Sequence, residues 1–323
     1  MRSSNPVRRR FTSVWTVALA FGLAVCSAVS IQAAELETAG LEAVQVRPNF
    51  YMIAGAGGNI GVQIGSDGVV LVNSGSGAAS TEVLAAIKKL TDTQIRYIIN
   101  TDAGADFVGG NAKLAKTGLN VLNGQTGAAI LAHESVLTRM SVRNAKPSYP
   151  GDAWPSEAFL AKRYAFRMND EAIEIFYQPA AHSDADSLVL FRKSDVVVAG
   201  DIMDTTRFPV IDIANGGSIQ GEIDALNRLI ELTVAPLPFI HKDVGTYVIP
   251  GHGRLCLQLD VVDYRDMVVV VRDVIADLIK QGKTLDQIKA AHPAKPYETE
   301  YGAQEGSTSA FVEAIYKSLT ARK

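Results

Sequence analysis

Four polar residues that could bind a metal ion or activate water each follow an apolar run of the chain. They are Asp106 in "NTDAGADFVGG" (residues 100–110), His182 in "QPAAHSDADS", Asp201 in "VVVAGDIMD" and His252 in "YVIPGHG". Taken singly, each is an ordinary capping or turn residue. Because strand ends direct side chains towards a shared rim, the four together predict one site where several strands end.

The elements that must position these residues follow from the hydrophobic pattern. Short apolar runs bounded by Gly and Asx predict strands, and apolar residues three and four apart predict helices. Interleaved strands and helices, without a visible repeat or linker, predict one layered α/β domain over residues 34–323. The predicted strands are 49–55, 59–65, 69–75, 94–100, 119–124, 172–179, 186–194 and 195–201, and the predicted helices are 80–90, 109–118, 127–141, 218–232, 261–282, 284–292 and 308–319.

The first 33 residues have the composition of a secretory signal peptide, a basic start followed by an uncharged apolar run. An uncleaved anchor stays an alternative, because this run is about as long as a short membrane span. Export predicts a periplasmic or extracellular protein with no membrane association beyond the leader. Cys256 would then be the one cysteine of the mature chain, so core packing rather than an intramolecular disulfide must stabilise it.

Charge and motifs exclude several classes of function. The leader carries four arginines and no acidic residue, so its removal changes the formal net charge from -3 to -7. An acidic mature chain argues against a nucleic-acid partner. The run "GAGGN" (residues 55–59) lacks the spacing and the following helix of a dinucleotide site, and there is no G-x-S-x-G serine-hydrolase motif. His133, His241 and His292 match no motif and are not expected to belong to a site.

In the order and context of these segments, the chain resembles the metallo-β-lactamase superfamily from about Phe50 to the C-terminus. The segments "GVVLVNSG", "NTDAGADFVGGN", "AAHSDADS", "VVVAGD" and "IPGHG" carry the resemblance. It implies an α/β layered (α+β) protein, a four-layer αββα sandwich with a metal site along one edge of the sheets. In that family two metal ions lower the pKa of a bound water, which then attacks the substrate.

The family's ligand set is incomplete in this chain. The resemblance places ligands at positions 102, 104 and 182 for one metal and at 106, 107 and 252 for the other, with position 201 bridging both. Asp102, Gly104 and Phe107 stand where the family has histidines, whereas Asp106, His182, Asp201 and His252 match. Asn73 replaces the aspartate that usually orients a ligand histidine. Too few ligands remain for the usual metal pair.

One divalent metal ion could still bind. Asp106, Asp201 and His252 would supply the three ligands that catalytic zinc needs, and manganese or iron would suit them as well. Asp102, His182 and Asp201 form a second possible set. Phe107 argues against both sets, because its ring offers no lone pair and excludes water. With no metal, the retained residues would only hydrogen-bond one another and hold the loops.

Two hypotheses about function follow. In the first, the protein is an exported hydrolase of ester, thioester or amide bonds with at most one metal ion, weak or altered activity, and Asp106 and His182 as its catalytic residues. In the second, it is a non-catalytic pseudoenzyme whose cleft binds a small molecule or a protein partner. In either case we expect the loop at residues 145–159 to line the cleft, with Trp154 facing an organic ligand.

Overall fold

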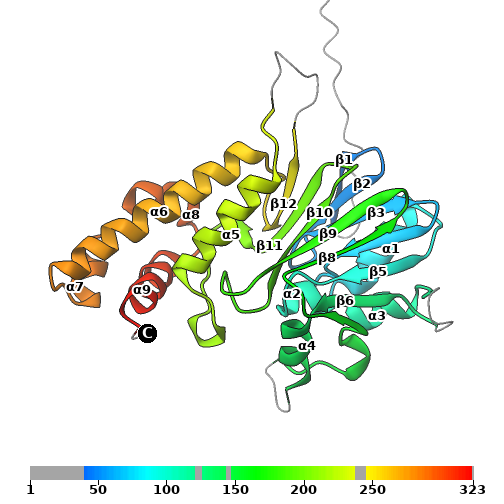
Figure 1. Ribbon diagram of the computed structural model, residues 1–323, viewed down its shortest axis with the longest axis horizontal. Helices are drawn as coiled ribbons and strands as arrows, with labels where there is room; N and C mark the ends of the chain where they lie inside the picture. The colour runs from blue at the N-terminus through cyan, green and yellow to red at the C-terminus, as the bar shows by residue number, and fades with distance from the viewer. Residues whose placement is uncertain (1–39, 121–125, 143–146, 237–244, 322–323) are drawn as a thin grey trace, which may run out of the picture. The chain divides into compact units, whose positions relative to one another are not determined.

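Two β-sheets lie face to face with helices on both outer sides (Figure 1). The computed structural model describes residues 40–120, 126–142, 147–236 and 245–321. This arrangement is a four-layer αββα sandwich and confirms the predicted fold class. The signal peptide predicted over residues 1–33 lies outside the described residues and stays a prediction.

The first sheet changes from antiparallel to parallel pairing along its width. Its order is β1-β2-β3-β4-β5-β6-β7, antiparallel from β1 to β4 and parallel from β4 to β7. The carboxyl ends of β4, β5 and β6 therefore meet at one edge. Its strands are β1 (Glu42–Arg47), β2 (Phe50–Ala54), β3 (Ile60–Gly65), β4 (Gly68–Val72), β5 (Ile95–Ile99), β6 (Ala129–His133) and β7 (Glu157–Phe159).

The second sheet has the order β12-β11-β10-β9-β8. β11 and β12 run parallel, so the ends of these two strands also meet at one edge. The other neighbouring strands are antiparallel. Its strands are β8 (Arg163–Met168), β9 (Glu171–Gln178), β10 (Asp186–Phe191), β11 (Val196–Asp204) and β12 (Tyr247–His252).

Helices flank both sheets, and several are short connectors. The α-helices are α1 (Ser80–Leu90), α2 (Ala105–Val108), α3 (Asn111–Lys116), α4 (Glu134–Ser141), α5 (Ile219–Leu232), α6 (Gln258–Lys280), α7 (Leu285–Ala290), α8 (Glu298–Tyr301) and α9 (Ser307–Thr320). Three 3-10 turns complete the described elements, at Gly151–Ala153, Ile213–Asn215 and Lys295–Tyr297.

Strand alternation explains how each sheet buries both faces. In β4, Val69 and Leu71 belong to the core under α1 and α3, whereas Val70 and Val72 belong to the core between the sheets. Successive strand residues point to opposite faces, so a strand buried on both faces is apolar throughout. Across the central core, the rings of Phe50 and Phe191 meet edge to face, with their centroids 4.8 Å apart.

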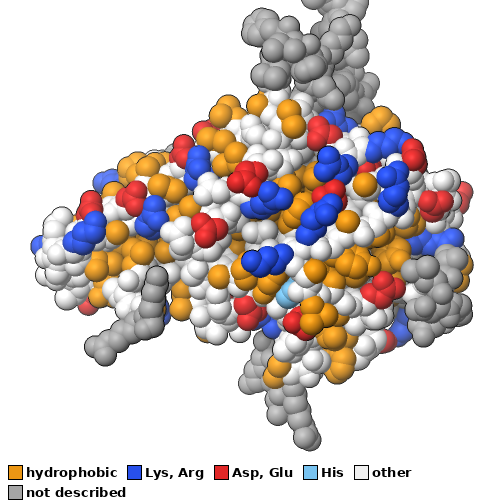
Figure 2. All heavy atoms as spheres, viewed as in Figure 1, with side chains coloured by type: hydrophobic (Ala, Val, Ile, Leu, Met, Phe, Trp, Pro, Cys, Tyr) orange, Lys and Arg blue, Asp and Glu red, His pale blue; other side chains and the backbone are white. Residues whose placement is uncertain are grey.

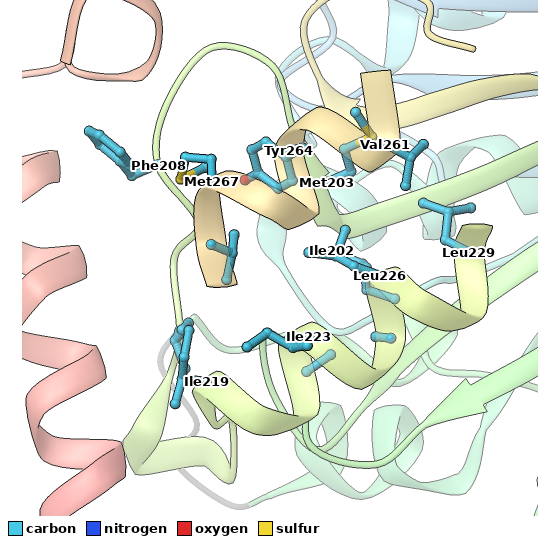
Figure 3. Close-up of a cluster of buried hydrophobic side chains, with 14 of the residues drawn as sticks. Ile202, Met203, Phe208, Ile219, Ile223, Leu226, Leu229, Val261, Tyr264 and Met267 are labelled. Atoms are coloured by element: carbon cyan, nitrogen blue, oxygen red, sulfur yellow. The ribbon is translucent and has the colours of Figure 1, made fainter. Parts of the chain in front are cut away.

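The outer core of the second sheet is built by α5 and α6. Figure 3 shows Ile223 and Leu226 of α5 and Tyr264 of α6 in one apolar cluster with Ile202 of β11. On α5 these apolar residues recur at helical spacing, which places them on one face. This packing holds α5 and α6 against β11, the strand that carries Asp201.

The structure corrects the helix predicted over residues 127–141. Residues 129–133 form strand β6, and only Glu134–Ser141 is helical. The run "AILAH" is buried along its whole length between β5 and β7, and a short apolar run of this kind fits a strand of a parallel sheet as well as a helix. The predicted strand at 119–124 is described only at residues 119 and 120, which lie outside the named strands.

Lys and Arg side chains gather on the face of the molecule shown in Figure 2, over the five-stranded sheet. Edge strand β8 exposes Arg163 and Arg167. Arg163 and Arg192 both pair with Glu174, so part of this charge is neutralised within the sheet. Among the described residues, no helix combines the length and the apolar character that crossing a membrane requires.

Candidate functional site

The edge where the parallel strands end brings together residues from distant parts of the chain. Asp106 lies in α2, in the segment that follows β5. Asp201 lies within β11, and His252 is the last residue of β12. The parallel register of β11 and β12 places Asp204 opposite His252. The structure thus unites three of the predicted residues and adds a fourth, Asp204.

His252 lies among three carboxylates. Its Nε2 is 2.8 Å from Asp106 Oδ2. Its Nδ1 is 3.5 Å from Asp201 Oδ1 and 3.4 Å from Asp204 Oδ2. Asp204 also accepts a 2.7 Å hydrogen bond from Nε of Arg207. His252 and Arg207 therefore face the carboxylates at this edge and can neutralise their negative charge.

This arrangement favours a protonated imidazole. Burial lowers the pKa of His252, but the carboxylates of Asp106, Asp201 and Asp204 outweigh burial and raise it to about 11. Burial raises the pKa of Asp106, but His252 outweighs burial, so the net pKa of that carboxyl is lowered. Ion pairing therefore favours the charged forms of both groups.

Phe107 fills the position of a family ligand with a buried aromatic ring. Its side chain is fully buried, and its ring centroid lies 5.6 Å from that of His252. A Cβ built on Gly58 would lie 2.4 Å from Cε1 of Phe107. The turn between β2 and β3 therefore packs tightly on this ring, so Phe107 is a packing residue in this structure.

His182 lies in the connection between β9 and β10. One ring nitrogen, Nδ1, is hydrogen-bonded to the carbonyl oxygen of Val210 at 2.7 Å, and the other, Nε2, is 3.7 Å from Asp201 Oδ2. Burial lowers the pKa of His182, but the nearby carboxylates of Asp201, Asp186 and Asp102 outweigh burial and raise it to about 9. His182 is thus a second histidine held by acidic residues.

Two further acids are buried beside His182. The amide and the hydroxyl of Ser183 both donate to Asp186 Oδ2. Asp102 accepts a hydrogen bond from the amide of Gly104 on Oδ1, whereas its buried Oδ2 has no hydrogen-bond partner among the described residues. Burial raises the pKa of Asp186 to about 7, and burial together with Asp201 and Asp186 raises the pKa of Asp102 well above its usual range.

Asn73 organises the loop that carries Asp102. Its Oδ1 accepts hydrogen bonds from the amide and the hydroxyl of Thr101 at 2.9 and 3.1 Å. Its backbone has a φ of 68°, a left-handed conformation that asparagine tolerates better than most residues. Asn73 therefore positions the backbone of this loop.

A cleft of about 370 Å³ opens beside these residues. Its lining includes Asp102, His182, Ser183, Arg139, Tyr149 and Asn215. Volumes of this order are typical of small-molecule sites. Neither Asp106 nor His252 lines the cleft, so it lies beside the His252 cluster. Asp102 and His182, two residues of the second possible metal set, do line it.

The predicted loop at 145–159 is described from residue 147 and forms strand β7 at its end, and it contributes to the cleft through a different aromatic residue from the one expected. Tyr149 lines the cleft, and Trp154 is not among the lining residues. Trp154 instead donates a hydrogen bond from Nε1 to the carbonyl of Tyr149 at 3.1 Å. Tyr149 donates from its hydroxyl to the carbonyl of Ala103 at 3.3 Å. Trp154 therefore supports the ring that faces the cleft.

Comparison with known proteins identifies the family. The model of the metallo-β-lactamase superfamily matches residues 54–252, which include all the candidate residues. The chain belongs to the metallo-β-lactamase superfamily. No curated protein matches the chain.

Solved metallo-β-lactamase-fold structures are similar in fold but distant in sequence. A double mutant of the sec-alkyl sulfatase PisA1 has a TM-score of 0.67 at 14% identity, covering 87% of this chain and 50% of its own. Pisa1 from Pseudomonas sp. gives 0.60 at 13% identity, over 85% and 49%. A metallo-β-lactamase from Pontibacter korlensis gives 0.56 at 14%, over 71% and 98%. The chain thus spans about half the length of the alkylsulfatase, and these likenesses establish the fold alone.

The superfamily implies divalent metal ions, but the residues of this chain do not fit one as they are placed. Asp106 and Asp201 approach different ring nitrogens of His252, and one imidazole binds a given ion through one nitrogen. In the described parts of the chain, no three His, Cys, Asp or Glu residues are grouped so as to hold a metal. Both metal sets therefore stay predictions.

The sequence analysis did not identify several residues of this site, although the sequence around two of them could have indicated a role. Asp204 follows Asp201 by three positions within the quoted run "VVVAGDIMD", where it marks the end of the strand. Asp186 stands in the quoted run "HSDADS". Arg139 and Tyr149 had no such signal, because only tertiary packing brings α4 and the 145–159 loop to the cleft.

Proposed function

We propose that this protein binds a small organic molecule in the cleft beside the former metal edge and performs no metal-pair hydrolysis. The observation that carries the proposal is the pairing of His252 with Asp106, Asp201 and Asp204 next to an open cleft of about 370 Å³. A cationic imidazole occupies the ring of acids in which a metal-dependent relative would need a metal ion.

Two features of the site support this reading. The buried ring of Phe107 provides no ligand atom and is fixed by the close approach of Gly58. The cleft is lined by polar groups from separate segments and by the ring of Tyr149, a mixture typical of small-molecule sites. Binding therefore needs only groups that the chain already holds in place.

The test is the metal content of the purified full chain, measured by inductively coupled plasma mass spectrometry together with turnover of ester, thioester and β-lactam substrates. We expect less than one tenth of a metal ion per chain, no turnover above background and an unchanged melting temperature in EDTA. Two tightly bound ions with fast turnover would overturn the proposal.

A hydrolase with one metal ion is the second candidate. Asp106, Asp201 and His252 lie together at one edge, which favours this function. Rotation of the His252 ring and a shift of the Asp201 side chain would bring one ring nitrogen and two carboxylates to the same point, as a three-ligand set requires. One zinc, manganese or iron ion per chain, lost in an Asp106→Ala/Asp201→Ala double variant that still folds, would establish this function instead. The matched control is Asp152→Ala, which changes an exposed carboxylate paired with Lys116.

We also propose that the protein is exported, on the basis of the basic and apolar character of residues 1–33. Expression of the full-length chain in a bacterium, followed by fractionation and N-terminal sequencing, tests this proposal. We expect a periplasmic or secreted product that begins near residue 34. A full-length product that stays in the cytoplasm would contradict it.

A further inference from the structure

Strand β8 is the outer strand of the five-stranded sheet, and among the described residues it pairs with β9 alone. The amide of Tyr177 donates to the carbonyl of Lys162 at 3.0 Å, so these two residues form a hydrogen-bonded pair at the start of the antiparallel ladder. Hydrogen-bonded and non-hydrogen-bonded pairs alternate along such a ladder. The backbone N–H and C=O groups of Arg163, Ala165 and Arg167 therefore point away from β9.

The contacts of β9 with β10 support the same register. The amide of Arg192, just after β10, donates to the carbonyl of Ala172 at 3.1 Å, so Ala172 faces β10. Ala172 is the residue opposite Arg167 in the pairing of β8 with β9. Outside the strand ladders, no backbone hydrogen bond of the described chain reaches residues 163, 165 or 167. Three donors and three acceptors are thus open to an added strand.

The side chains of the same three residues form an exposed row on the outer face of the sheet. Arg163, Ala165 and Arg167 are exposed, whereas the alternate residues Tyr164 and Phe166 pack against the core between the sheets. A small side chain thus lies between two cations. An added strand would meet arginines at two positions four residues apart, with space for a large side chain between them.

The charge around this row is positive, on the face of the molecule where Lys and Arg gather (Figure 2). Four cations, each more than half exposed, share two carboxylates: Glu174 pairs with Arg163 and Arg192, and Asp170 pairs with Arg167 and Lys193. The chain as a whole has a net charge of -3. Because physiological salt screens exposed charges beyond about 8 Å, the local excess of cations decides which partner is attracted.

We propose that β8 binds an extended segment of another protein by strand addition, and that this segment carries acidic side chains opposite Arg163 and Arg167. The backbone of β8 supplies the hydrogen bonds, and the two arginines supply the preference for acids. A second copy of this chain fits poorly, because antiparallel pairing of two β8 strands about Ala165 sets Arg163 of each copy opposite Arg167 of the other. No residue of β8 lines the cleft, so this surface is separate from the proposed function.

The probe is a capped peptide of threonine, glutamate, valine, tyrosine, valine, glutamate and threonine, in that order. As a strand it presents both glutamates and the tyrosine on one face. One control peptide replaces both glutamates with lysine, and another keeps the charges but N-methylates the tyrosine, which removes the central backbone donor. Binding to the purified full chain is measured by ligand-observed NMR titration at physiological salt. We expect each control to bind at least tenfold more weakly.

Hydrogen–deuterium exchange separates strand addition from loose electrostatic attachment. The amides of Arg163, Ala165 and Arg167 face outward in the free chain and should exchange fast. Hydrogen bonds to an added strand should slow their exchange at saturating concentrations of the acidic peptide. Exchange that stays unchanged over residues 163–167 would overturn the proposal, even if the peptide bound elsewhere.

Ala165→Pro blocks the free edge and spares the ladder with β9, because the N–H that proline lacks points outward. We expect it to weaken the acidic peptide at least tenfold at an unchanged melting temperature. Arg163→Gln/Arg167→Gln should remove the advantage of the acidic peptide over the lysine peptide. Lys280→Gln/Lys317→Gln removes two exposed cations from α6 and α9 and should change neither affinity.

Several outcomes would overturn the proposal. The acidic and lysine peptides could bind equally, or the folded chain could bind no peptide. Dimers in sedimentation that Ala165→Pro abolishes would make a second copy the occupant. Binding to phosphatidylglycerol vesicles without peptide binding, lost in Arg163→Gln/Arg167→Gln, would make a membrane surface the occupant. None of these results bears on the metal content or turnover that tests the proposed function.

Discussion

His252 of β12 connects three acidic residues, two from strand β11 and one from the short helix α2. Its contacts reach Asp106 through Nε2 and Asp201 and Asp204 through Nδ1. An ion pair of this kind, which is mostly buried, stabilises only while both partners are charged. The ion pairs of His252 therefore contribute to the pH dependence of stability.

Replacing His252 with Gln should destabilise the protein by about 3 kcal/mol, because it leaves the buried acids without a cation. The folded pKa is raised to about 11, above the usual value of 6.5, so this stabilisation is fully present below about pH 6.5. It is lost progressively as the pH rises towards 11. Urea unfolding of both proteins between pH 5 and pH 10 measures the difference.

His292→Asn is the control, because His292 is exposed and has a positive φ of 48° that asparagine tolerates. It should shift the free energy of unfolding by less than about 0.5 kcal/mol across this range. A gap between the native chain and His252→Gln that stays constant up to pH 10 would contradict a charged His252.

At the scale of elements, the turn between β2 and β3 and helix α2 depend on each other for close packing. Gly58 lies in this turn, and Phe107 lies in α2. The side chain of Phe107 occupies the space that a Cβ on Gly58 would need. Mutations in either element should therefore have effects that depend on the other.

Gly58→Ala should cost about 1 to 3 kcal/mol through overpacking against Phe107. The same change made in a Phe107→Leu background should cost clearly less, because the narrower side chain leaves room. Chemical unfolding of the four proteins in this cycle gives the coupling. Gly151→Ala, where no atom lies within 4 Å of the new Cβ, is the control. Additive effects of the two changes would contradict the proposed packing.

The N-terminus of α5 is fixed by Ser218. Its hydroxyl accepts from the amide of Gly221 at 3.0 Å and donates to the carbonyl of Ala180 at 3.1 Å. Ala180 precedes His182 by two residues, so this cap also fixes the loop that carries the histidine. The cap therefore connects the start of a helix with the wall of the cleft.

Ser218→Ala should lower the free energy of unfolding by about 1 kcal/mol, a typical cost for a lost N-cap. It should also loosen the 180–183 loop, so the backbone amides of this loop should exchange with solvent faster. Thr284→Ala removes the cap of α7, which is far from this loop in sequence, and should affect stability alone. Calorimetric melting and hydrogen–deuterium exchange together test this. Equal exchange rates of the 180–183 loop in the two variants would contradict the link.

At the scale of the whole molecule, the outer core contains a buried acid. Glu222 of α5 is fully buried, and within the described part of the chain neither of its carboxylate oxygens has a hydrogen-bond partner. Burial, followed by the nearby charge of Asp186, raises its pKa well above the usual value. The folded chain therefore holds this group protonated at a pH where the unfolded chain releases the proton.

A raised acid pKa means that stability falls as the pH rises above the unfolded value of about 4.5. Glu222→Gln removes this dependence, so the variant should become more stable than the native chain as the pH increases. The difference should grow by at most about 1.4 kcal/mol for each pH unit until the folded group ionises. Urea unfolding from pH 4 to pH 8 measures it.

Glu231→Gln is the matched control on the same helix, because Glu231 is exposed and pairs with Arg228. It should leave the pH dependence of the native chain nearly unchanged. Parallel stability curves for the native chain and Glu222→Gln would show that the buried carboxyl is not protonated on folding.

The sequence by itself determined the layers of the fold and the identity of the residues at the metal edge. Local periodicity depends on the order of residues alone, so strand β4 (Gly68–Val72) and helix α5 (Ile219–Leu232) were predicted, at 69–75 and 218–232. The same reasoning was wrong for residues 129–133, because a short apolar run has the same pattern in a buried strand and in a buried helix.

Only the tertiary structure decided how the retained residues are used. The strand register of β11 and β12 places Asp204 against His252, and packing directs the two nitrogens of that ring towards different acids. The same packing brings Tyr149 to the cleft that Asp102 lines. These contacts join residues far apart in the chain, and their geometry depends on the whole folded arrangement rather than on local spacing.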